Sequence, residues 1–92
     1  MVAAVRQRLG HVLDDMGRRL AELRRARGWT QAEAATALGM AEKDFQAIEN
    51  GRRAISLRTA VDIANVFGIP VRDLFDPPAS REPRRPGRPS HS

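Results

Sequence analysis

Hydrophobic residues recur along the chain at the three- and four-residue spacing of amphipathic helices, and no segment alternates as a strand does. Glycines that can end a helix in the left-handed conformation separate these stretches, at Gly28, Gly39, Gly51 and Gly68. Helices are therefore predicted over residues 15–27, 31–38, 42–50 and 57–67, with one short final turn or helix over 71–75. The pattern predicts an all-α fold.

Two of these helices carry clear start signals. Thr30 and Glu33 have the spacing of a capping box, in which each side chain accepts a hydrogen bond from the other residue's backbone amide. Ser56 is placed to cap the helix that begins at Leu57. The helix from Glu42 has Ala41 where a cap is expected, so its early carboxylates are expected to act on the helix dipole instead.

The first stretch, residues 1–14, is a separate amphipathic extension in this interpretation. Val2, Val5, Leu9 and Val12 lie on one helical face. Asp14 and Asp15 can cap a new helix, so we expect a break there. A short isolated helix is marginal, so the apolar face should be buried. It packs either on its own bundle or on the same helix of a second subunit, and we favour the second because a dimer needs a self-complementary surface.

Residues 31–50 suggest what the fold does. Two short helices joined by a tight turn containing Gly39 are the minimum needed to place one helix in the major groove of DNA. The helix that begins near Glu42 would be the reading helix. Sequence-specific DNA binding is therefore the leading hypothesis.

Several spaced motifs carry a family resemblance. They are R-x-x-R-G-W-T-Q at 24–31, A-x-x-x-G at 35–39, I-E-N-G at 48–51 and I-A-x-x-F-G-I-P at 63–70. In this order they resemble the phage-repressor-like helix-turn-helix family of the Cro/cI or XRE type. The resemblance implies a compact five-helix helix-turn-helix bundle over residues 15–76, whose second and third helices read DNA, and a homodimer bound to double-stranded DNA.

The resemblance also assigns roles to individual residues. It places base contacts on the reading helix, at Glu42, Lys43, Asp44, Gln46 and Ala47. It places phosphate contacts at Gln31, Asn50, Arg52 and Arg53. It implies a buried structural ion pair between Arg24 and Glu49. Glu42 and Asp44 depart from the usual pattern, because a carboxylate accepts a hydrogen bond from cytosine but repels phosphate. These two carboxylates either contribute to sequence specificity or weaken DNA binding.

The composition of the chain excludes several other classes of function. Ninety-two residues allow one small domain, and the absence of cysteine excludes disulfides and thiolate metal sites. His11 and His91 are too far apart in sequence to suggest a metal cluster. We expect no cofactor, no small-molecule ligand, no membrane span and no signal peptide, and hence a cytoplasmic, nucleoid-associated protein. No catalytic constellation is evident, so the chain is not expected to be an enzyme.

The net charge of +5 is concentrated at the C-terminus. Residues 77–92 contain four arginines, one glutamate and five prolines, which predicts a disordered basic tail. The run from Arg84 to Pro89 loosely resembles an AT-hook, but a solvated tail or non-specific attraction to phosphate explains it as well.

The sequence thus predicts a transcriptional regulator that binds a short palindromic operator as a homodimer. An antitoxin or adaptor that uses the same fold to bind a protein, and a controller protein of a restriction–modification system, remain alternatives.

Overall fold

The computed structural model describes the backbone of residues 2–84 and the side chains of residues 8–84. These residues form α1 (Val2–Ala26), α2 (Gln31–Leu38), α3 (Glu42–Glu49), α4 (Leu57–Phe67) and a 3₁₀ helix, η1 (Val71–Phe75). The all-α prediction is confirmed. The resemblance implied five helices; in the part of the chain that the structure describes, four are α-helices and the fifth element is the short 3₁₀ helix.

The helix ends follow the predicted chemistry. The Thr30 hydroxyl accepts from the Glu33 amide at 3.0 Å, and the Glu33 carboxylate accepts from the Thr30 amide at 2.8 Å. Ser56 caps α4 through the Thr59 amide, while Ala41 offers no side-chain cap to α3. Gly39 ends α2 with φ of 68°. These local signals fix the two short helices of the motif at either side of one tight turn.

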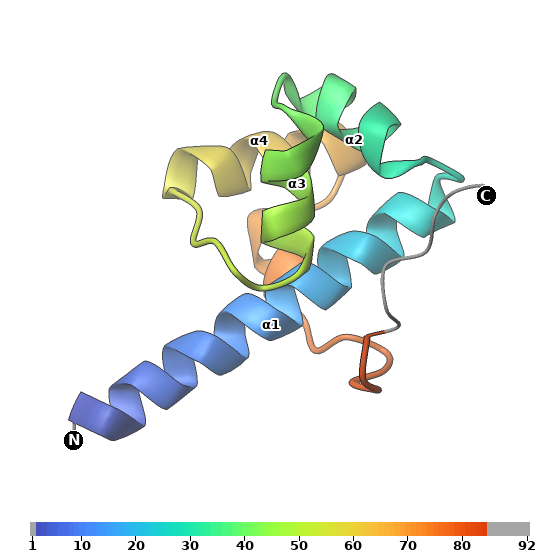
Figure 1. The fold of residues 1–92 in the computed structure, drawn as a ribbon. Helices are drawn as coiled ribbons and strands as arrows, with labels where there is room; N and C mark the ends of the chain where they lie inside the picture. Colours follow the sequence, from blue (N-terminus) through green and yellow to red (C-terminus); the bar gives the residue numbers. More distant parts are fainter. Residues whose placement is uncertain (1, 85–92) are drawn as a thin grey trace.

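The core lies where the second half of α1 crosses beneath α2, α3 and α4 (Figure 1). It is made of fully buried apolar side chains from all five elements, chief among them Met16, Leu20, Ala34, Phe45, Ile63 and Leu74. Phe45 and Ile48 are the inward residues of α3, so burying them turns the opposite face of that helix outward.

The predicted break at Asp14–Asp15 is wrong, because α1 runs without interruption from Val2 to Ala26. The Asp14 carboxylate accepts from Arg18 Nε one turn later at 2.9 Å, so it supports the helix from within instead of capping a new one. Gly17 is tolerated inside the helix because α3 packs directly against it. Residues 2–14 of the predicted extension are therefore the start of α1 and no separate helix.

The N-terminal half of α1 projects beyond the bundle (Figure 1). Leu13 packs against the core, but Leu9 is 54% exposed and Val12 is 48% exposed. The predicted apolar face is thus uncovered by the protein's own bundle at these two positions. The side chains of Val2 and Val5 lie outside the described residues.

Residues 77–84, which we call the C-terminal strap, return along α1 after η1. The strap has no regular secondary structure, yet hydrogen bonds from Ala79, Arg81 and Arg84 attach it to other elements. Disorder of the tail over residues 77–92 stays a prediction from its composition, which excludes a core; in the structure, the strap arginines dock on carboxylates of α1. Arg85 and Arg88 lie outside the described residues.

Candidate nucleic-acid interface

The exposed face of α3 carries the residues assigned to base contact. Glu42 and Lys43 are exposed, while Asp44, Gln46 and Ala47 are half-buried around the same helix. Gln46 Nε2 donates to Glu42 Oε2 at 3.3 Å, which orders the two side chains on one face. Lys43 supplies the positive charge in the first turn of α3, where Glu42 and Asp44 are acidic.

Asp44 is paired with the loop that follows α3. Arg53 Nη1 lies 2.8 Å from Asp44 Oδ1; the Arg53 side chain is exposed and the Asp44 side chain is partly exposed to solvent. Arg53, which the resemblance assigned to phosphate, therefore neutralises one of the two carboxylates on the reading helix. The repulsion expected between Asp44 and a DNA backbone is reduced by the same contact.

A polar cluster joins α1, α2 and α3 around Glu49, which is only 4% exposed. Arg24 Nε donates to Glu49 Oε2 at 2.6 Å, and Arg24 Nη1 donates to the Trp29 carbonyl at 2.8 Å. Gln31 Nε2 donates to Glu49 Oε1 at 2.9 Å. The structure thus brings Arg24 and Glu49 together, and it also directs one amide hydrogen of Gln31 inward. Gln31 helps to fix the start of α2 relative to α3.

A groove of about 1200 Å³ lies between α1, the start of α2, the end of α3 and the C-terminal strap. It is lined by four of the residues assigned to DNA contact, namely Gln31, Gln46, Asn50 and Arg52. Glu42, Lys43, Asp44, Ala47 and Arg53 are not among its lining residues. The assigned residues therefore divide into the groove and the neighbouring outer face of α3.

Sequence reasoning missed the contribution of α1 to this groove. Arg18 and Arg25 line it beside Arg24. They are seven residues apart, a spacing that places them on one face of a helix, and this was the available signal. Arginines from α1 and Arg52 therefore outnumber Glu22 and Glu49 in the walls contributed by the helices and the loop after α3, and this excess of positive charge suits an anionic backbone.

Among residues 8–84, no group of three or more His, Cys, Asp or Glu side chains is arranged to hold a metal ion. None of the described helices combines the length and apolar character needed to cross a membrane.

An exposed reading helix, a glycine turn and an adjoining basic groove define a helix-turn-helix DNA-binding fold. The chain belongs to the helix-turn-helix domain family, whose match covers residues 15–76. The predicted resemblance to XRE-type regulators is confirmed. The fold is that of DNA-binding regulators of transcription.

Three solved structures illustrate the likeness. The restriction-modification controller protein C.AhdI from Aeromonas hydrophila is 35% identical, with a TM-score of 0.65 over 68% of this chain and 96% of that protein. The hypothetical transcription factor NHTF from Neisseria is 26% identical, with a TM-score of 0.67 over 75% and 80% of the two chains. An HTH_3 family transcriptional regulator from Vibrio cholerae, 21% identical with a TM-score of 0.67 over 73% and 38%, shows the fold alone. No similar sequence was found among curated proteins.

Proposed function

We propose that this protein is a cytoplasmic, nucleoid-associated transcriptional regulator that binds a short palindromic operator as a homodimer. The observation that carries the proposal is the exposed face of α3 beside the arginine-walled groove. A helix presented in this way fits the major groove, while the neighbouring cations meet the phosphates on its edge.

The proposal gives the two groups of residues different tasks. On the outer face of α3, Lys43 donates to guanine acceptors. Gln46, at the edge of the groove, reads a neighbouring base, with Glu42 holding the Gln46 amide. Asp44 and Ala47 complete this base-contacting surface. Asn50, Arg52 and Gln31 meet the phosphate backbone from the groove, and Arg53 does so from the loop after α3.

The dimer is proposed to form through the projecting half of α1. Leu9 and Val12 lie three residues apart on this helix and are about half exposed. Apolar side chains on a projecting helix are stabilised when a second copy covers them, and a two-fold pairing of the same helix is self-complementary. Two reading helices related in this way match the symmetry of a palindromic site.

A second candidate within the same class is a controller protein of a restriction–modification system. It is favoured by the 35% identity to C.AhdI, since 96% of that controller protein is covered by this chain. Binding to DNA immediately upstream of a restriction or methyltransferase gene in the source genome would support it. A preferred site with no such neighbouring gene would favour a general regulator.

The direct test is selection of bound sequences from a random DNA pool, followed by a salt titration on the preferred site. We expect a palindromic consensus. Affinity should fall on the order of 10³-fold between 50 and 200 mM salt if a dimer neutralises about six phosphates. The absence of salt-sensitive DNA binding, together with a protein that co-purifies in stoichiometric amounts, would replace this proposal with the antitoxin or adaptor alternative.

A further inference from the structure

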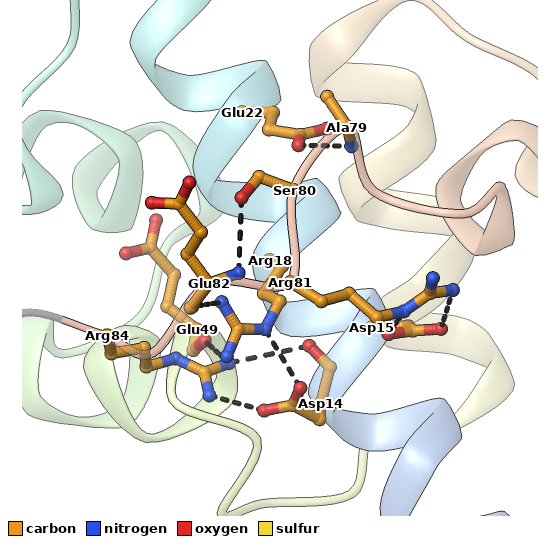
Figure 2. A network of polar contacts seen from close by, with 10 residues as sticks. All are labelled: Asp14, Asp15, Arg18, Glu22, Glu49, Ala79, Ser80, Arg81, Glu82 and Arg84. Carbon is orange, nitrogen blue, oxygen red and sulfur yellow. Dashed lines mark hydrogen bonds and ion pairs between the residues drawn. The ribbon is translucent and has the colours of Figure 1, made fainter.

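The C-terminal strap is held on α1 by a network of polar contacts (Figure 2). Arg81 Nε and Nη2 donate to the two carboxylate oxygens of Asp15, each at 2.8 Å. The Ala79 amide donates to Glu22 Oε2 at 2.6 Å, and Arg18 Nη1 donates to the Glu82 carbonyl. The strap therefore contacts α1 through its backbone as well as through an arginine.

The strap also reaches the end of the reading helix. Arg84 Nη1 donates to the Asp14 carboxylate, and Arg84 Nη2 donates to the Glu49 carbonyl at 2.9 Å. Glu49 is the last residue of α3, so this guanidinium sits at the negative end of the helix dipole. One strap arginine thus links α1 to the C-terminus of α3 (Figure 2).

This position places the strap inside the proposed DNA interface. Its residues Ser80, Glu82, Pro83 and Arg84 line the same groove as Gln31, Asn50 and Arg52. Glu82 adds a third carboxylate to a groove that is also lined by Glu22 and Glu49 and by arginines of α1. A DNA backbone that entered the groove would meet the strap and this negative charge.

The arginines of the docked strap contribute little positive charge that could attract DNA, because both are engaged by carboxylates of α1. Arg81 is paired with Asp15, and Arg84 shares the carboxylate of Asp14 with Arg18. The pKa of Asp15 is lowered, mainly by the hydrogen bonds from Arg81. Burial opposes ionisation of Asp14, but the hydrogen bonds from Arg18 and Arg84 outweigh it, so that the pKa of Asp14 is also lowered.

We propose that the strap is an autoinhibitory cover, which occupies part of the DNA-backbone groove and must leave it before the protein binds DNA at full strength. The inference rests on the proposed function. The strap lies outside the matched family domain, which ends at residue 76, so it is a device added to the DNA-binding unit.

The contacts that hold the cover are suited to reversible release. Because exposed ion pairs are individually weak, the population of the docked state should exceed that of the open state by roughly 3- to 10-fold. Because only the open state is competent, freeing the strap should tighten DNA binding by about the same factor.

The test disrupts the Arg81–Asp15 ion pair in the full-length protein by substituting one partner at a time. Arg81→Gln removes a positive charge and Asp15→Asn removes a negative one, so simple electrostatics predicts opposite effects on DNA affinity. The cover predicts the same effect, a roughly 3- to 10-fold tighter complex with the selected operator at fixed salt, for both variants. Arg72→Gln and Asp62→Asn are the matched controls, since both residues are exposed and neither lines the groove.

Release itself is followed by the NMR signal of the Ala79 amide, whose hydrogen bond to Glu22 should be lost in both strap variants and kept in both controls. Weaker binding by Arg81→Gln with tighter binding by Asp15→Asn would overturn the inference and make the strap an ordinary basic arm that contacts DNA. Affinities equal to those of the controls would overturn it as well. Failure of every protein, wild type included, to bind DNA in a salt-sensitive manner would instead reject the proposed function, and the cover with it.

Discussion

At the scale of single residues, Glu49 connects the elements that form the candidate nucleic-acid interface. Its buried carboxylate accepts from Arg24 of α1 and Gln31 of α2, and its carbonyl accepts from Arg84 of the strap. The family motifs indicated the partnership with Arg24. The contacts from Gln31 and Arg84 could not be predicted, because they depend on how α2 and the strap lie in space and not on any spacing in the sequence.

The polar cluster should be essential for stability. Arg24→Ala leaves the buried Glu49 carboxylate without its cation, and we expect it to lower the free energy of unfolding by about 3–5 kcal/mol. For a domain this small, such a loss approaches the whole stability. Thermal or urea unfolding measures the loss. Gln31→Ala, which removes only a neutral donor, serves as the milder comparison, and an unchanged midpoint for Arg24→Ala would contradict the structural role of the pair.

Lys43 and Arg52 should separate base reading from backbone contact. Lys43→Ala is expected to weaken binding to the preferred site by roughly 1–3 kcal/mol and to affect random DNA little, because a base contact carries sequence information. Arg52→Ala is expected to weaken binding to both DNAs about equally, since phosphates are the same in every sequence. Binding titrations on the two DNAs distinguish the roles, and equal losses for Lys43→Ala would reassign it to phosphate.

At the scale of elements, the sequence predicts helix ends better than helix continuity. The capping box at Thr30 and the left-handed glycines at Gly39 and Gly68 are local chemistry, and each appears where it was expected. The continuity of α1 was missed because Asp14 and Asp15 resemble a cap locally. Their side chains are instead taken by Arg18 and by Arg81, the latter 66 positions away. Long-range partners of this kind leave no local signal.

The contact between α1 and α3 supplies a sharp test of the packing. A Cβ atom added at Gly17 would lie 2.4 Å from the Glu49 carbonyl oxygen and 2.7 Å from that of Ile48. Backbone atoms cannot rotate away, so Gly17→Ala should lower the free energy of unfolding by about 1–3 kcal/mol. Gly10→Ala, on the same helix with nothing within 4 Å, should leave the melting temperature unchanged or raise it. Similar melting of the two variants would argue against the close approach of the helices.

At the scale of the whole molecule, the sequence correctly indicated the all-α fold class and the two short helices of the motif, but not how the ends of the chain are used. Local periodicity reports which face of a helix is apolar, and this was enough for Phe45 and Ile48 of α3. It does not report what covers that face. Leu9 and Val12 therefore read as buried from their pattern, yet they stand exposed on the projecting part of α1.

That exposure leads to a prediction about assembly. Deleting residues 1–12 retains Leu13 and the core residues from Met16 onward, so the truncated protein should stay folded. If the projecting half of α1 pairs with its copy, truncation should convert a dimer into a monomer and weaken operator binding, because the two reading helices are no longer linked. Sedimentation or light scattering measures the mass, and circular dichroism checks the fold. The control is Leu57→Ser, which alters the most exposed large apolar side chain among residues 8–84, on α4, with 75% of its surface exposed. A truncated protein that remains dimeric, with Leu57→Ser monomeric, would move the proposed interface from α1 to α4.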